Sequence, residues 1–116
     1  SQSNKYSDIE QEIRLIGFKV SNIDSIDDGE IIASATIQNL KSQPIKLSVT
    51  VFIEGSDLRA NKKVVIEPNQ AETVVFNLGR LFDSDFMIDD NEVVVTIVIH
   101  DGEKRIVKHR VAEISK

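Results

Sequence analysis

The clearest pattern in this sequence is the alternation in Ile45-Lys-Leu-Ser-Val-Thr-Val-Phe-Ile-Glu54, where an aliphatic side chain stands at every second position. Because successive side chains of a strand point to opposite faces, this alternation predicts a strand with one buried face. Residues 31–38 and 73–78 alternate in the same way. Residues 93–99 are almost continuously β-branched, which is typical of a strand that is covered on both faces.

Turn-forming residues separate these runs. Pro68 is preset for the first central position of a turn, and Asn69 tolerates a positive φ at the second. Asp101-Gly102 lies between two strand-like runs and predicts a type I′ hairpin. The inward phase of the first run changes near Ile16-Gly17, which indicates a β-bulge. Strands are predicted over residues 13–20, 30–40, 45–54, 62–67, 72–78, 92–100 and 104–114.

These seven short strands, without a convincing helix, predict an all-β fold: an antiparallel Ig-like β-sandwich of about seven strands. A closed barrel is the alternative. The pattern leaves open which sheet residues 9–20 join. The inward positions of the best strands predict the core, which consists of Ile31, Ala33, Ala35, Ile37, Leu47, Val49, Val51, Val74, Phe76, Val95 and Ile97.

A chain of 116 residues is long enough for one hydrophobic core. We expect residues 1–8 to be a polar tail or linker and residues 9–116 to be a single domain. The net charge of −5 argues against nucleic acid as the partner. No apolar run approaches the ~18 residues of a membrane span. The chain begins with Ser1 and its only methionine is Met87, so we expect a processed protein or a piece of a longer one, which has lost a signal peptide, an N-terminal membrane helix or a purification tag.

The sequence offers no catalytic motif. The only imidazoles, His100 and His109, are expected to be solvated strand residues, since neither stands beside a nucleophile or at metal-ligand spacing from the other. There is no cysteine, no glycine-rich phosphate loop and no His-Glu-x-x-His sequence. We therefore predict a protein that is not an enzyme and that has no cofactor and no metal site.

Acidic residues gather in two predicted connections. In an Ig-like strand order these two connections leave the same end of the sandwich, so the acids would form one pole. Carboxylate oxygens suit Ca²⁺, but Phe86-Met87-Ile88 interrupts the ligand spacing and no EF-hand pattern follows, so a solvated pole is expected. The residues are Asp24, Asp27, Asp28 and Glu30 in the first connection and Asp83, Asp85, Asp89, Asp90 and Glu92 in the second.

The last predicted strand and its hairpin carry a basic cluster. No aromatic residue is interleaved with these basic residues, as it usually is on a nucleic-acid surface. We expect them to protect a sheet edge. The cluster consists of Lys104, Arg105, Lys108, His109 and Arg110.

A second surface feature is formed by apolar residues at the outward positions of the strands, which alternate with the positions predicted to face the core. Phe52, Val94 and Val98 stand at such outward positions, with Thr96 between the two valines and Ile106 expected at the margin. The third, sixth and seventh strands of an Ig-like sandwich share a sheet, so these side chains would form one patch. Scattered single apolar residues are the ordinary explanation, but monomers seldom expose a contiguous apolar patch. We predict a protein interface made by Phe52, Val94, Thr96 and Val98.

One strand ends in Asn39, a long alternating strand ends near Gly55, and Pro68-Asn69 precedes Val74-Val-Phe76. In this order the chain resembles the CARDB-like group of extracellular Ig-like domains. Its layout is similar to that of the soluble domains of archaellum stator proteins, over about residues 30–114. The group commonly has Pro-Gly where this chain has Pro68-Asn69. The resemblance implies an Ig-like domain on the outer side of a membrane, anchored by an N-terminal helix.

We therefore expect a non-catalytic protein-interaction domain of a cell-envelope or motility assembly, located outside the membrane. It would act by pairing sheet faces with a second copy, as a homodimer, or with a related subunit. One alternative is an accessory domain of a secreted enzyme, since residues 53–58 are similar to part of the C-terminal Ig-like domains of transglutaminases. A calcium-dependent adhesin domain, using the acidic pole, is a further alternative.

Overall fold

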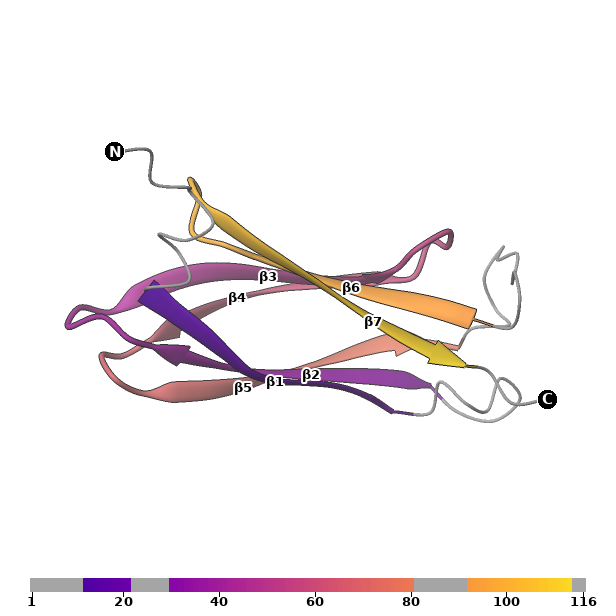
Figure 1. Ribbon diagram of the computed structural model, residues 1–116, viewed down its shortest axis with the longest axis horizontal. Helices are drawn as coiled ribbons and strands as arrows, with labels where there is room; N and C mark the ends of the chain where they lie inside the picture. Colours follow the sequence, from indigo (N-terminus) through magenta and orange to yellow (C-terminus); the bar gives the residue numbers. More distant parts are fainter. Residues whose placement is uncertain (1–11, 22–29, 81–91, 114–116) are drawn as a thin grey trace.

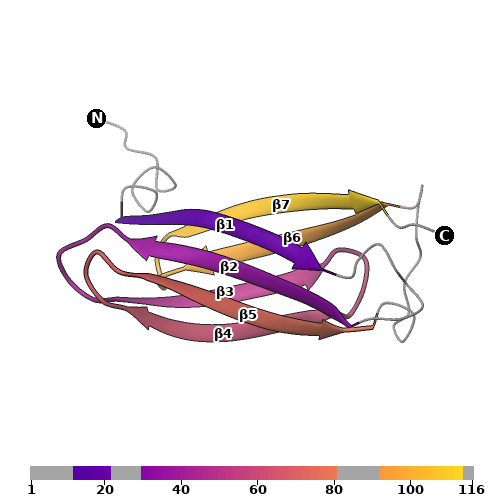
Figure 2. The same ribbon diagram turned by 90° about the horizontal axis from the view of Figure 1, so that it is seen from below.

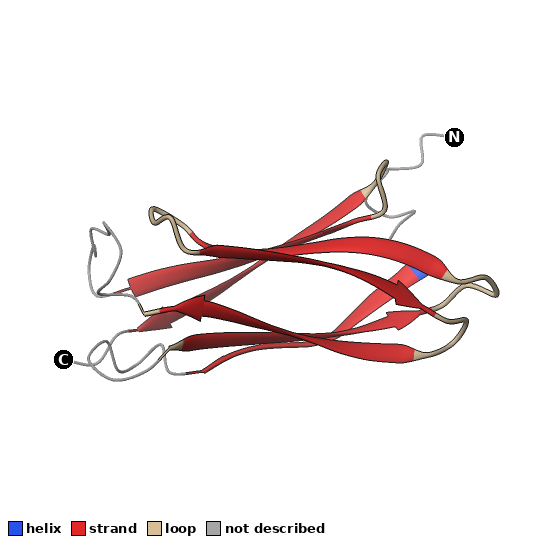
Figure 3. Ribbon diagram, turned by 180° about the vertical axis from the view of Figure 1, so that it is seen from behind, coloured by secondary structure: helices blue, strands red, loops and turns tan. Residues whose placement is uncertain are grey.

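The computed structural model describes residues 12–21, 30–80 and 92–113. Strands dominate them (Figure 3). The predicted boundaries hold to within a residue, except that the fourth strand begins at Arg59 rather than at residue 62. The strands are β1 (Ile13–Ser21), β2 (Ile31–Asn39), β3 (Ile45–Ile53), β4 (Arg59–Ile66), β5 (Ala71–Gly79), β6 (Glu92–His100) and β7 (Arg105–Glu113).

The strands form two sheets that lie face to face (Figures 1 and 2). Sheet I has the strand order β1-β2-β5, and sheet II has the order β4-β3-β6-β7. All paired strands are antiparallel. This arrangement confirms the predicted Ig-like sandwich and excludes the barrel, and it places β1 beside β2. As expected, β3, β6 and β7 share a sheet.

The core lies between the sheets, and every residue predicted for it is buried. The alternating aliphatics of β3 are no more than 6 % exposed, and Val93, Val95, Ile97 and Ile99 of β6 are no more than 1 % exposed. Burying an aliphatic side chain of this size stabilises the fold by about 1.5–3 kcal/mol. This burial free energy, repeated at every second residue of β3 and of β6, therefore stabilises the inward register of both strands.

Two local predictions are confirmed. The register of β1 against β2 shifts between Leu15 and Gly17, which is the expected bulge, and Ile16 is left 54 % exposed. Asn69 has a φ of 61°, and the Gln70 N–H donates to the Glu67 carbonyl at 3.1 Å, which closes the predicted turn.

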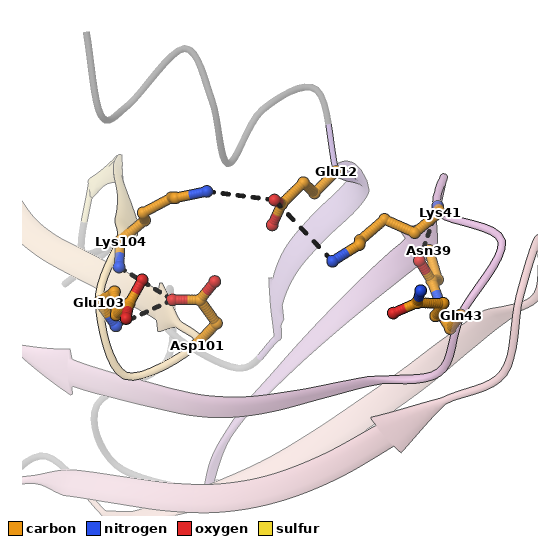
Figure 4. Close-up of polar contacts among 7 residues, drawn as sticks. All are labelled: Glu12, Asn39, Lys41, Gln43, Asp101, Glu103 and Lys104. Atoms are coloured by element: carbon orange, nitrogen blue, oxygen red, sulfur yellow. Dashed lines mark hydrogen bonds and ion pairs between the residues drawn. The ribbon is translucent and has the colours of Figure 1, made fainter.

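The type I′ prediction for the β6–β7 hairpin is wrong. A type I′ turn needs positive φ at both central residues, whereas Gly102 has a φ of 105° and Asp101 does not have a positive φ. Residues 101–104 instead form a longer loop between the paired His100 and Arg105. Asp101 Oδ1 accepts hydrogen bonds at 2.9 Å from the backbone N–H groups of Glu103 and Lys104 (Figure 4). The side chain of Asp101 thus supplies the turn's hydrogen bonding.

Opposing influences act on the pKa of Asp101. Partial burial works to raise it, but the amides of Lys104 and Glu103 and the charge of Lys104 lower it by more. The net result is a pKa below the ordinary value of 3.8. The carboxylate is therefore the form that the hairpin stabilises.

Buried Asn39 ties the two sheets together where β2 ends (Figure 4). Its amide donates to the Gln43 carbonyl at 2.7 Å and to the Ile66 carbonyl, at the end of β4, at 2.9 Å. Its Oδ1 accepts from the Lys41 N–H at 2.8 Å. Because β2 and β4 belong to different sheets, a single side chain fixes their relative position at this end.

Glu12 makes a second connection at the same end (Figure 4). Its carboxylate lies 3.1 Å from Lys104 Nζ in the β6–β7 loop and 4.0 Å from Lys41 Nζ in the β2–β3 loop. The residue just before β1 is therefore held by charge to loops from both sheets.

Candidate interaction face

The predicted interface residues all lie on the side of sheet II that is turned away from sheet I, which we call the outer face. Phe52 of β3 is opposite Thr96 of β6, and Val98 of β6 is opposite Thr50 of β3. Val94 lies further along β6 on the same face. No other strand of the described residues packs over this face (Figure 1).

Thr96 is at the centre of the patch and is only 2 % exposed. Phe52, Val94 and Val98 surround it and are half-buried. Ile106 was expected at the margin, and this prediction is wrong: Ile106 is opposite Ile99, faces inward and is 3 % exposed.

Two valines that the sequence did not identify extend the patch onto β7. Val107 is opposite Val98, and Val111 is opposite Val94 and 58 % exposed. Their signal in the sequence was the alternation of Val107, His109 and Val111. The neighbouring basic residues obscured it.

A row of basic residues crosses the outer face beside the apolar patch. Ser48 of β3 is opposite Lys63 of β4 on one side and His100 of β6 on the other, and His100 is opposite Arg105 of β7. We call Lys63, His100 and Arg105, which are aligned through Ser48, the cationic row. The row was not predicted, because it is assembled from four strands whose register only the folded chain reveals.

Further cations lie close to this row. Lys46 is two positions from Ser48 on β3, and Arg59 of β4 is opposite Phe52. Lys46, Arg59, Lys63 and Arg105 are all exposed. Glu54 also belongs to this face and lies 3.8 Å from His109 Nδ1. At the other end of the face, the register places Glu92 of β6 opposite Glu113 of β7. The end of the face that holds the cationic row is therefore the positive one.

Two hollows open on the outer face, on either side of His100. The first, of about 320 Å³, is lined by Lys46, Leu47, Ser48, Lys63, Val64, Val65, His100, Asp101 and Gly102. The second, of about 400 Å³, is lined by Thr50, Phe52, Ser56, Arg59, Val98, His100 and Arg105. Both hollows combine apolar side chains with cations.

His109 lies next to a hydroxyl, contrary to the expectation that neither histidine would stand beside a nucleophile. Its Nδ1 is 2.8 Å from Thr96 Oγ1 and 3.8 Å from Glu54 Oε2. In a catalytic triad the acid and the nucleophile contact different nitrogens of the histidine ring. Here Glu54 and Thr96 both lie next to Nδ1 of His109. Thr96 is also almost completely buried. The arrangement therefore does not have the geometry of a triad.

The basic cluster of the last strand does not form one surface, because alternate side chains point in opposite directions. Arg105 and His109 belong to the outer face, whereas Lys108 and Arg110 have inward parity at the sheet edge. Arg110 Nη1 donates to the Phe18 carbonyl of β1 at 3.3 Å. Inward charges of this kind protect edge strands from pairing with other chains.

Lys62 of β4 does the same at the opposite edge. Its Nζ donates to the Val75 carbonyl of β5 at 2.6 Å and lies 5.8 Å from the centre of the Phe76 ring. Side chains of sheet II thus cover a backbone carbonyl on each edge strand of sheet I.

Most of the acidic residues predicted for one pole lie outside the described residues, namely Asp24, Asp27, Asp28, Asp83, Asp85, Asp89 and Asp90. Of the other two, Glu30 is exposed just before β2, and Glu92 begins β6. The strand ends that flank these segments do meet, since Ile32 is opposite Ser21 and Ile31 is opposite Gly79. Within residues 12–21, 30–80 and 92–113, no group of three or more acidic or histidine side chains is placed to hold a metal ion. In the same part of the chain, no helix is long and apolar enough to span a membrane.

The site and the fold together define an Ig-like β-sandwich in which the outer face of sheet II combines apolar and basic side chains and is not covered by any other described strand. No family model matches the sequence, and no curated protein matches it. Among solved structures, a FixG-related protein from Vibrio parahaemolyticus is similar, with a TM-score of 0.66 and 11 % identity over 90 % of this chain and 98 % of that chain.

A second similar structure is the alkylpurine DNA glycosylase AlkC of Pseudomonas fluorescens, bound to DNA containing an abasic site analog. The TM-score is 0.60 and the identity 14 %, over 90 % of this chain but only 31 % of that chain. At such low identities the likeness shows the shared fold.

Proposed function

We propose that this protein is a non-catalytic protein-interaction domain that binds its partner through the outer face of sheet II. The contact residues are Phe52, Val94 and Val98, extended by Val107 and Val111, and Thr96, which was predicted with them, is buried at their centre. The observation that carries the proposal is the composition of β6, which has β-branched side chains on both faces although the described strands cover only one. A strand of this composition is typically covered on both sides, and a contiguous apolar patch on a small domain marks an interaction site.

The chemistry of the face supports binding rather than catalysis. Among the described side chains of the face, the Thr96 hydroxyl contacts the His109 imidazole. This hydroxyl is buried, and the triad geometry that would activate it is missing. Apolar side chains at the centre with polar residues around them are the usual anatomy of a protein interface.

The proposed setting is a cell-envelope or motility assembly on the outer side of a membrane. The support for this part of the proposal is the resemblance to CARDB-like domains and to the soluble domains of archaellum stator proteins. In such a setting the partner would be a related subunit or a second copy.

A second candidate function is that of an accessory domain in a larger enzyme. It is favoured by the match to AlkC, where the similar part is 31 % of the longer chain. In that case the outer face would pack against another domain rather than against another protein.

Gel filtration of extracts from the cells that make the protein tests the interaction. We expect the wild type in a complex larger than its own chain, and Val98→Lys at the size of its own chain. Val75→Lys is the matched control, because Val75 is 48 % exposed on the outer side of sheet I. This control variant should remain in the complex. Loss of the complex in both variants, or in neither, contradicts the proposal.

A further inference from the structure

We infer that the outer face binds an acidic polypeptide segment whose carboxylates meet the cationic row and whose apolar side chains meet Phe52 and Val98. This inference rests on the proposed function and names the chemistry of the partner. It replaces the simpler expectation of two identical faces pairing.

The distribution of charge carries the inference. Lys46, Arg59, Lys63 and Arg105 are exposed on this face, and the structure shows no ion pair for any of them within the described residues. Because opposite potentials face each other across specific interfaces, the positive end of this face fits an acidic partner.

The hollows explain why the partner segment should also be partly apolar. The hollow of about 400 Å³ places Phe52 and Val98 between Arg59 and Arg105. An aliphatic side chain resting there would leave neighbouring carboxylates within reach of both arginines. Arginine is well suited to such contacts, because its planar guanidinium binds a carboxylate with two parallel hydrogen bonds.

A symmetric pair in which the two cationic rows meet does not satisfy these charges. In a twofold pair the same patch is present on both sides, so the cations of one row would need carboxylates from the other row. The row contains none. Such a pair would therefore bring several unpaired cations together, which is unfavourable at an interface. The register places Glu92 opposite Glu113 at the other end of the face, so a second copy in the opposite orientation is one of the outcomes that the test below distinguishes.

Nucleic acid is a weaker match to the same charges. A nucleic-acid-binding domain is usually basic overall and presents aromatic side chains on which bases stack. This chain has a sequence pI of about 5.0, and Phe52 is the only aromatic side chain of the outer face apart from the two histidines.

Backbone amide NMR shifts test the inference with a short synthetic peptide of alternating Glu and Val. We expect this peptide to shift amides of the outer face in β3, β6 and β7, with an affinity that falls as salt is added. The same peptide with Lys for each Glu, and a single-stranded DNA oligonucleotide of the same charge as the Glu peptide, should shift them much less. The double variant Lys63→Glu, Arg105→Glu should lose about tenfold in affinity for the Glu peptide. Lys19→Glu, on the outer side of sheet I, should keep the wild-type affinity.

The contrary outcomes separate this inference from the proposed function. Equal shifts with the Lys peptide would show that the face binds protein without regard to charge, which overturns the acidic partner and leaves the proposed function intact. Tighter binding of the oligonucleotide at the same amides would overturn both. No shift with the Glu peptide at millimolar concentration, while the wild type self-associates and Val98→Lys does not, would replace the acidic partner with a second copy.

Discussion

Replacing Asn39 by Ala removes the side chain that joins β2 to the end of β4. The substitution leaves the Ile66 carbonyl without its 2.9 Å partner, and Ile66 is completely buried. The loss of a buried hydrogen bond of this kind costs about 1–1.5 kcal/mol. The bonds to Gln43 and Lys41 lie nearer to water, which can replace them, so each contributes about 0.5–1 kcal/mol. The free energy of unfolding should fall by about 3 kcal/mol, a large part of the ~5–15 kcal/mol of a typical domain.

Urea unfolding measures this loss, with the slope against denaturant expected to stay unchanged. Asn61→Ala is the matched control, because the Asn61 amide also donates two bonds, to Ser48 and Thr50, but is exposed. That control should cost less than about 1 kcal/mol. If Asn39→Ala costs no more than Asn61→Ala, the reasoning that Asn39 joins the two sheets is refuted.

The remaining predictions concern the inward register and the turns. Val51→Ala should lower the free energy of unfolding by about 2 kcal/mol and Phe52→Ala by less, because Val51 is completely buried and Phe52 only half-buried; the reverse order in urea unfolding would contradict the register. The stability difference between wild type and Asp101→Asn should be fully present above pH 3.8 and should shrink as the pH falls through the lowered folded pKa; urea midpoints over a pH series check the sign, and a difference that grows in acid would refute it. Asn69→Val should cost about 1–2 kcal/mol, since Asn69 has a φ of 61°, whereas Asn69→Gly should not destabilise; equal thermal unfolding of the two variants would argue against a strained turn.

The strands and the core could be predicted from the sequence because both depend on local periodicity. Each inward set, such as that of β3, repeats every second residue and would turn to solvent after a slip of one position. The bulge near Ile16 followed from the same rule, because only an extra residue lets Leu15 and Phe18 both face the core. Local chemistry also placed the turn at Asn69.

The features that sequence reasoning missed depend on contacts between distant segments. The cationic row brings Lys63, His100 and Arg105 together across strands whose alignment no local pattern contains. The β6–β7 hairpin departed from type I′ because the Asp101 side chain hydrogen-bonds two backbone amides, an alternative that the dipeptide Asp-Gly does not reveal. The bonds of Asn39 to a loop and to another sheet were likewise invisible in the sequence.

Photo-crosslinking in the cells that make the protein tests the central claim most directly. A photoreactive amino acid at position 111 would stand on the outer face, where Val111 is 58 % exposed. The same amino acid at position 75 would stand on sheet I, where Val75 is 48 % exposed. We predict a discrete covalent adduct to one partner protein from position 111 that disappears when Val98→Lys is added, and none from position 75. Equal adducts from both positions, or an adduct that survives Val98→Lys, would contradict the assignment of the outer face as the interface.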